Sequence, residues 1–263
     1  MVRASKGRAP EKKMIRRKMM ELMKTLGEVF ASWLIAYFVC GIVHEGGHVV
    51  AGLVQGWKFA LLVVGPFKLY RDEKDDKVKF GLEKNVALWG GIGGAVPTEE
   101  SEDNLQKFAR VLLAGPVSSL VMGLLCGISL FFGVSVFKAM MTFVPIAMGI
   151  ACLIPNAKTG ILYTDGGRYL RIVKGGKTMA EEKAIFDATF HENFHPGSRF
   201  DEAGIEAMTT SEDATFQYMG HYYAYQNAKM AQDQDGMQAS VASMEGLKAK
   251  VSKFIRESYV VEN

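Results

Sequence analysis

The sequence predicts a mainly α-helical, polytopic membrane protein. We expect a helical core of three long apolar spans plus a half-span, a small β-element between spans 1 and 2, and a soluble helical C-terminal domain. Hydrophobic residues make up 49% of the 263 residues and charged residues 22%, and the two kinds are segregated along the chain. Residues 111–133 and 139–157 contain no Asp, Glu, Lys or Arg, and all three cysteines lie in apolar runs. This composition excludes collagen-like, disordered and disulfide-stapled proteins.

The N-terminal segment is basic. Residues 1–24 hold nine Lys or Arg and two Glu, a pattern typical either of a nucleic-acid-binding arm or of the cytoplasmic flank of a membrane span. Because the apolar run begins immediately afterwards, at Val29, we favour the membrane flank and expect no nucleic-acid partner. A cleaved signal peptide fits poorly, because the basic region is long and the apolar run continues into polar residues.

Three apolar runs are long enough to cross a bilayer. The first covers residues 29–55, and as a helix it would be about 40 Å long. The second covers residues 111–133, and the third covers residues 139–157 and includes Pro145 and Pro155. Buried hairpins of a soluble protein are the alternative, and the presence of three such runs in one chain of this size argues against it.

Polar segments separate and follow these runs. Between residues 57 and 107, the stretch FALLVVGPFKLY is typical of a strand, and WGGIGGAVPT is rich in glycine. We expect a small hairpin or sheet there, at the membrane surface or dipping into it. From Gly175 onward, helical spacing predicts three or four soluble helices, with breaks at 195–197 and around 233–236 and a last helical segment over 242–260. They could pack on each other, on the membrane core or on a protein partner.

A metal-binding pattern lies inside the first apolar run, where residues 44–48 read HEGGH. His44 and His48 stand at positions i and i+4 and share one helix face, so both imidazoles can reach a single zinc ion. Glu45 beside them can hold and deprotonate the metal's water. One ionisable residue at the centre of a bilayer costs about 2.5–3.5 kcal/mol, so three together need a reason, and metal coordination supplies one. Polar contacts between helices are the alternative.

A second match, HENFH at residues 191–195, is interpreted differently. Pro196 disfavours helical backbone at His195, and Gly197 prevents the helix from continuing. The i, i+4 geometry is therefore weakest at a residue that would have to face the metal. We interpret this copy as a coincidence or as the end of a surface helix.

A tetrahedral catalytic zinc needs a third protein ligand. Asp165 is the candidate, because it follows an apolar hairpin and the two glycines after it allow close approach of the backbone to the metal helix. By itself, Asp-Gly is an ordinary turn signal.

The side of the membrane on which this segment lies is constrained in two ways. Three complete spans after a cytoplasmic N-terminus would place residue 158 outside, whereas the basic residues that follow, Arg168, Arg171 and Lys174, favour a cytoplasmic position for the segment. A half-span that carries Asp165 back into the membrane reconciles the two.

Three motifs together resemble the site-2 protease family of intramembrane zinc metalloproteases. They are HEGGH in an apolar helix, AGP at residues 114–116 opening a second apolar helix, and LIPNAKTGILYTDGG after the third. The resemblance covers roughly residues 28–175. Ser119 and Cys152 stand where members usually or often have asparagine, and the last motif is longer than in many members. These differences concern contacts to a substrate strand more than the metal site.

The resemblance implies one zinc ion held by His44, His48 and Asp165, with Glu45 as general base and a zinc-bound water as nucleophile. It also implies that WGGIGGAVPT lies in the surface β-element thought to clamp an unwound substrate. The expected function is hydrolysis of a peptide bond in a membrane-anchored protein or peptide. A catalytically inactive membrane scaffold or metal-binding protein of the same fold is the alternative. A soluble zinc peptidase built on residues 191–195 is a third reading, which we disfavour.

The expected organisation has three parts. They are a basic cytoplasmic tail (1–25), a membrane-embedded metalloprotease core (26–175) and a soluble helical C-terminal domain (176–263). The protein is expected to be an integral, multi-pass membrane protein in contact with the lipid bilayer. Its N-terminus is expected to be cytoplasmic, and the membrane to be the plasma membrane if the protein is bacterial.

Overall fold

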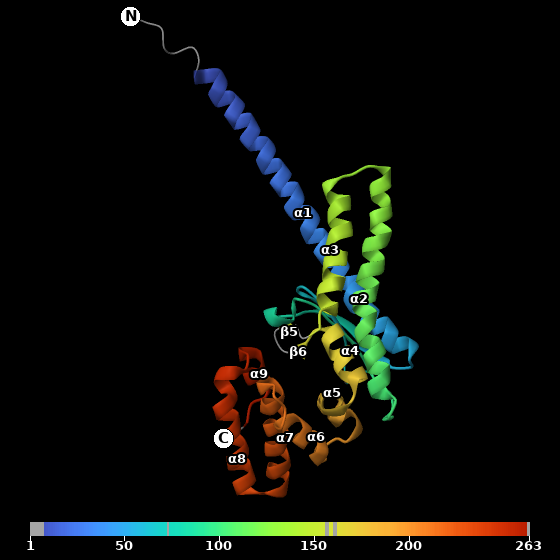
Figure 1. The fold of residues 1–263 in the computed structure, drawn as a ribbon, viewed down its shortest axis with the longest axis vertical. Coiled ribbons are helices and arrows are strands. Elements are labelled where there is room, and N and C mark those ends of the chain that lie inside the picture. The colour runs from blue at the N-terminus through green and yellow to red at the C-terminus, as the bar shows by residue number, and fades with distance from the viewer. Residues whose placement is uncertain (1–7, 73, 156–157, 160–161, 262–263) are drawn as a thin grey trace, which may run out of the picture.

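Helices dominate the computed structural model, which describes residues 8–72, 74–155, 158–159 and 162–261 (Figure 1). Within this part of the chain, three helices are long and apolar enough to cross a membrane. They are α1 (Arg8–Val54), α2 (Asn104–Ile128) and α3 (Val136–Leu153). The expected mainly α-helical class with three long apolar helices is therefore confirmed. Residues 1–7 of the expected tail, 156–157 and 160–161 of the last motif, and 262–263 lie outside the described residues.

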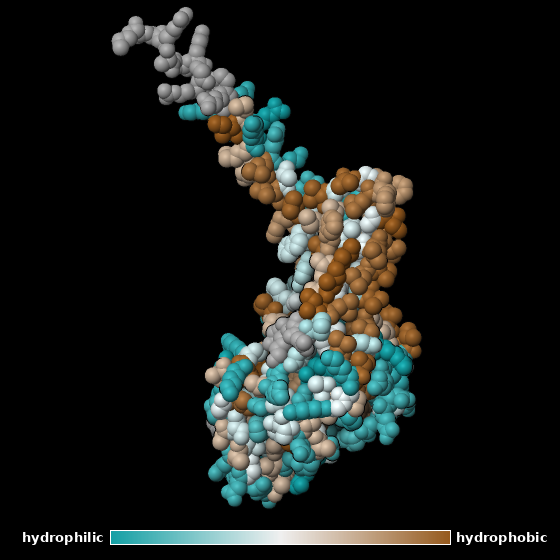
Figure 2. Space-filling view, in the orientation of Figure 1, coloured by the Kyte–Doolittle hydropathy of each residue, from teal (hydrophilic) through white to brown (hydrophobic). Residues whose placement is uncertain are grey.

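Apolar side chains cover one end of the molecule. Figure 2 shows hydrophobic residues over the hairpin of α2 and α3, and hydrophilic residues over the opposite end, where the C-terminal helices lie. Large exposed apolar side chains on α2 include Leu124 and Leu125. An apolar surface of this extent is suited to contact with lipid rather than with water.

The long helices approach each other closely through glycine. At Gly47 of α1, a side chain would collide with the backbone of α2 at Ala114. At Gly123 of α2 and Gly149 of α3, the neighbouring helix leaves no room for a side chain either. Small residues allow helix backbones to pack this closely in membrane bundles. Of the two glycines in HEGGH, Gly47 packs against α2, whereas Gly46 has open space beside it.

The end of α3 differs from the sequence prediction. The helix stops at Leu153 rather than at residue 157, because Ile154 has extended backbone (ψ 118°) and Pro155 follows it. A proline disfavours helical backbone in the residue before it. The proline therefore ends the helix inside a run that is apolar to residue 157.

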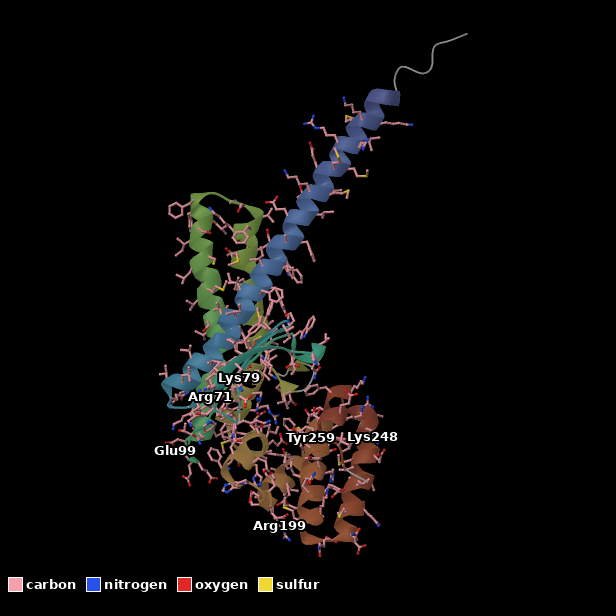
Figure 3. All side chains as sticks on the ribbon, turned by 180° about the vertical axis from the view of Figure 1, so that it is seen from behind. Arg71, Lys79, Glu99, Arg199, Lys248 and Tyr259 are labelled. Atoms are coloured by element: carbon pink, nitrogen blue, oxygen red, sulfur yellow. The ribbon has the colours of Figure 1, made fainter. Side chains whose placement is uncertain are left out.

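A four-stranded antiparallel sheet follows α1, as expected between the first two spans. Its strands are β1 (Lys58–Val64), β2 (Phe67–Arg71), β3 (Val78–Leu82) and β4 (Ile92–Val96), in the order β3-β2-β1-β4. Figure 3 shows Arg71 and Lys79 among the charged side chains on this sheet. The glycine-rich segment forms β4, an edge strand whose pairing with β1 runs from Lys58↔Val96 to Val63↔Ile92.

Short elements connect the sheet and the long helices. The 3-10 turn η1 (Val86–Leu88) precedes β4, and η2 (Ser129–Phe132) lies at the tip of the α2–α3 hairpin. Two short strands, β5 (Lys158–Thr159) and β6 (Leu162–Tyr163), pair and lead into α4 (Asp165–Lys174). Helix α4 has 10 residues, which corresponds to about 15 Å and is too short to cross a bilayer. It has the length expected of a half-span.

Five helices form the C-terminal part of the described chain, one more than the upper number expected. They are α5 (Gly176–Phe194), α6 (Glu202–Thr209), α7 (Ala214–Ala231), α8 (Gln234–Leu247) and α9 (Lys253–Ser258). The breaks expected after residue 194 and near residue 233 are present. The prediction of a single helical segment over 242–260 is wrong, because α8 ends at Leu247 and is followed by the 3-10 turn η3 (Lys248–Lys250). Ser252 then starts a new helix by accepting a hydrogen bond from the Ile255 amide.

Two hydrophobic clusters meet at α5. Ala184 belongs to the core of the C-terminal helices. Phe186, also on α5, belongs to a second cluster with Trp57 and with Leu112 of α2. The C-terminal helices therefore pack both on each other and on the rest of the chain. Helix α1 passes residue 25 without a break, and α5 begins at Gly176.

The arrangement of the hairpin predicts a labelling pattern in membranes. Val134 lies between η2 and α3 and Met230 lies on α7, both exposed, and these elements are at opposite ends of the molecule (Figure 1). In sealed vesicles of uniform orientation, we expect an impermeant maleimide to modify only one of Val134→Cys and Met230→Cys, because the apolar helices would separate the two ends. The wild type, whose three cysteines lie in α1, α2 and α3, is the control and should stay unmodified. Modification of both positions from the same side would contradict a spanning arrangement.

Candidate metal centre

Three side chains from distant parts of the sequence converge at one point. His44 and His48 lie one turn apart on α1, and Asp165 is the first residue of α4. The Asp165 Oδ2 atom lies 3.3 Å from His44 Nε2 and 3.7 Å from His48 Nε2. Both histidines are buried, whereas 23% of the Asp165 side chain is exposed. In the part of the chain that the structure describes, this is the one group of three or more His, Cys, Asp or Glu side chains whose ligand atoms are close enough to share an ion.

Hydrogen bonds behind each imidazole fix its orientation. His48 Nδ1 donates to the Val111 carbonyl at 2.7 Å. Because a carbonyl only accepts, this nitrogen carries the proton, and His48 Nε2 keeps a free lone pair. His44 Nδ1 lies 2.9 Å from the hydroxyl of Ser119, which is fully buried. Outer hydrogen bonds of this kind set the tautomer and ring direction of metal-binding histidines, and here they leave both Nε2 atoms turned toward Asp165.

The distances from the Asp165 oxygen to the two histidine nitrogens fit a shared zinc ion. Zinc in proteins is bound tetrahedrally by nitrogen and oxygen donors at about 2.0–2.2 Å, so two donors to one ion lie about 3.3–3.6 Å apart. The N···O separations of 3.3 and 3.7 Å are close to that spacing. Two histidines and a carboxylate are also a ligand set of catalytic zinc, which keeps a further position for water. The expected ligands His44, His48 and Asp165 are therefore brought together, and the identity of the metal stays a prediction.

Glu45 lies beside this group, against the glycine-rich segment. It is buried and interacts electrostatically with His44 and Asp165. A side chain at Gly91 would collide with the Glu45 carboxylate, and one at Gly93 would collide with the Glu45 backbone. Gly91 also has φ +116°, a conformation that other residues rarely adopt. Glycine at these two positions therefore allows the segment to lie directly against the residue expected to act as general base.

Helix α4 is attached to the end of α3. Thr164 caps α4 by accepting a hydrogen bond from its first turn, and the Thr164 hydroxyl donates to the Ile154 carbonyl at 2.7 Å. A side chain at Gly166 would collide with the backbone of Leu153. Of the two glycines expected to allow close approach to the metal-binding helix α1, Gly166 makes its close approach to α3 instead. This attachment places the first residue of α4 next to the two histidines.

The second HExxH match forms no such group. Helix α5 ends at Phe194, and His195 has non-helical backbone. His191 Nε2 lies 3.1 Å from the Ser198 carbonyl, and His195 Nε2 lies 3.1 Å from a Glu100 carboxylate oxygen. These residues line a cavity of about 690 Å³ between α5 and the segment before α2. The interpretation of residues 191–195 as the end of a surface helix is confirmed.

Three residues of the site were missed in the sequence. Val111 and Ser119 hold the two histidines, and the His48 ring occupies the space where a side chain at Gly115 would project. Gly115 is the central residue of the AGP motif, so the motif indicated that this position matters, but not that it makes room for His48. Ser119 was noted only as a difference that concerned substrate contacts, whereas its hydroxyl contacts His44. The role of Val111 depends on a backbone carbonyl and has no signal in the residue type.

No family model matches the chain, and neither a curated protein nor a solved structure matches it. The resemblance to site-2 proteases therefore depends on the three sequence motifs alone. Each motif contributes to the candidate centre: HEGGH provides the two histidines and Glu45, AGP provides room for His48, and the last motif provides Asp165.

Replacing Ser119 with alanine tests the outer hydrogen bond. We expect Ser119→Ala to bind zinc about 10–100-fold more weakly than the wild type, because His44 loses the group that orients it. The measurement is competition with a chromogenic chelator on detergent-purified protein. Ser118→Ala, the preceding residue on α2, is the matched control and should bind zinc like the wild type. Equal affinity in Ser119→Ala would show that this hydroxyl does not orient His44.

Proposed function

We propose that the chain is an intramembrane zinc metalloprotease of the site-2 protease type, which hydrolyses a peptide bond of a membrane-anchored protein or peptide. The observation that carries this proposal is the convergence of His44, His48 and Asp165 on helices that include a span long and apolar enough to cross a membrane. Two imidazole Nε2 atoms are turned toward one carboxylate oxygen. A shared cation explains that arrangement better than structural hydrogen bonding does, because each histidine already has a partner at Nδ1.

The chemistry requires a general base next to the metal. A bound zinc ion would lower the pKa of a coordinated water and polarise the scissile carbonyl. The Glu45 carboxylate accepts one proton as the water oxygen attacks the carbonyl carbon. It then delivers this proton to the amide nitrogen as the C–N bond breaks, so that one amine and one carboxylic acid are formed, the acid keeping the second proton of the water. Burial of Glu45 keeps this proton transfer away from bulk water.

The edge strand β4 offers a place for an extended substrate. Within the described part of the chain, no strand pairs with the outer side of β4. A peptide added there by main-chain hydrogen bonds would run close to Glu45, because residues 91 and 93 lie against it. Peptide bonds in a helix are shielded, so pairing with β4 would also hold the substrate in an unwound form.

The alternative, an inactive scaffold or metal-binding protein of the same fold, would share the three ligands. Such a protein has no use for a further buried carboxylate beside them, and burying an ionisable group is unfavourable unless it is compensated. Glu45 is buried in this way, and two glycines make room for it. Its presence favours the enzyme.

Replacing Glu45 with glutamine separates the two functions. We expect Glu45→Gln to retain zinc, because Glu45 is not among the ligands, and to lose about 10²–10⁴-fold in cleavage rate, the usual contribution of a general base. The assay incubates protein in detergent micelles with a panel of single-span peptides and detects the products by mass spectrometry. His48→Ala, which removes a ligand, should lose both zinc and cleavage. Cleavage by Glu45→Gln at the wild-type rate, or a zinc-loaded wild type that cleaves nothing, would support the scaffold.

A further inference from the structure

A buried charge cluster joins α4 to α5. Glu182 is fully buried and accepts hydrogen bonds from Arg168 Nε and Arg171 Nε, both at 2.8 Å and each on a different carboxylate oxygen. Glu181, also buried, forms an ion pair with a terminal nitrogen of Arg171. Arg168 and Arg171 lie about one turn apart on α4. Glu182 therefore holds this helix at two points.

The same two arginines contact both halves of the molecule. The guanidinium of Arg168 lies over the ring of Phe108 on α2, at 4.9 Å from its centre. The guanidinium of Arg171 lies over the ring of Phe216 on α7, at 5.0 Å. Guanidinium groups stack favourably on aromatic faces. The cluster thus connects α4 to the long helices and to the core of the C-terminal helices.

Asp165 is the first residue of α4, and the turn that joins α4 to α5 follows the last residue, Lys174. Gly175 and Gly176, with φ of +73° and +62°, make the turn between α4 and α5. Thr178 closes the turn by donating to the Arg171 carbonyl at 3.0 Å. Because α4 is a continuous helix of 10 residues, a change in its tilt also moves Asp165. Functional groups lose their geometry when they shift by about 0.5 Å, so the support of α4 matters to the ligand.

We propose that Glu182 is a positioning residue for the metal centre. By holding Arg168 and Arg171 it fixes the tilt of α4, so the C-terminal helical domain positions Asp165 together with the attachment of α4 to α3. The inference rests on the metal centre of the proposed function. A buried ion pair adds little to the stability of a fold, because desolvation offsets much of the attraction, whereas its charge-assisted hydrogen bonds are directional. The cluster is thus suited to holding an orientation.

The test measures zinc affinity in the full-length chain in detergent. We expect Glu182→Gln to bind zinc about 10–100-fold more weakly, as when an outer-shell partner is lost, while circular dichroism stays that of a folded protein. Asp187→Asn is the matched control, because Asp187 lies on α5 but pairs with Lys183 of the same helix. It should bind zinc like the wild type.

A double-mutant cycle with Asp165→Ala separates positioning from general stability. Without Asp165 there is nothing left to position, so adding Glu182→Gln should lower the affinity by less than about 2-fold further. Losses that multiply in full would indicate a structural role and overturn the inference. If Glu182→Gln does not fold, Arg168→Lys keeps the charge but removes one directed contact. It should lower the affinity in the same way.

Amide hydrogen exchange gives a readout that does not depend on metal. In Glu182→Gln we expect faster exchange over residues 165–174, with unchanged exchange in the middle of α2. Unchanged zinc affinity and unchanged exchange, in a chain whose wild type binds zinc, would overturn this inference alone. A wild type that binds no zinc would overturn it together with the proposed function.

Discussion

The distance between Asp165 and the two imidazoles is the constraint on which the rest of the site depends. His44 and His48 share a face through the pitch of one helix, but Asp165 reaches them across 121 residues of sequence. It does so because α2 and α3 form a hairpin that brings the chain back, and because Gly166 lets α4 begin against the end of α3. Small residues at the helix crossings therefore help to bring the three side chains together.

The surroundings of the centre come from every part of the fold. Helix α2 holds the two histidines through Val111 and Ser119. The edge strand β4 lies against Glu45. Helix α5 is bound to α4 by the hydrogen bonds that Glu182 accepts from Arg168 and Arg171. A site that is assembled in this way links the apolar helices, the sheet and the C-terminal helices. In the proposed function, catalysis, substrate docking and support of the ligands would each depend on a different one of these parts.

Local patterns in the sequence predicted the elements and pointed to the three side chains that converge, His44, His48 and Asp165. The three apolar runs became α1, α2 and α3, and the spacing of His44 and His48 predicted their shared face. Asp165 was the candidate for a third ligand because it follows the apolar hairpin and precedes two glycines. The end of α3 and the break before α9 were missed although local signals existed, a proline at 155 and a capping serine at 252.

Other parts of the site could not be predicted from the sequence. The contacts of Ser119 with His44 and of Glu182 with two arginines depend on how packed helices are rotated about their axes. Hydropathy records which residues are apolar, but it does not record which polar atoms face each other across a crossing. The contacts of Ser119 and Glu182 therefore become visible only when the packing of the helices is known.

The zinc content of detergent-purified protein, wild type beside Asp165→Ala, tests the metal centre most directly. The wild type should contain about one zinc ion per chain by elemental analysis, because three protein ligands are enough to retain a catalytic zinc. Asp165→Ala should contain much less, while its helical circular dichroism stays unchanged. Equal zinc in the two proteins, or none in either, would contradict a centre formed by His44, His48 and Asp165.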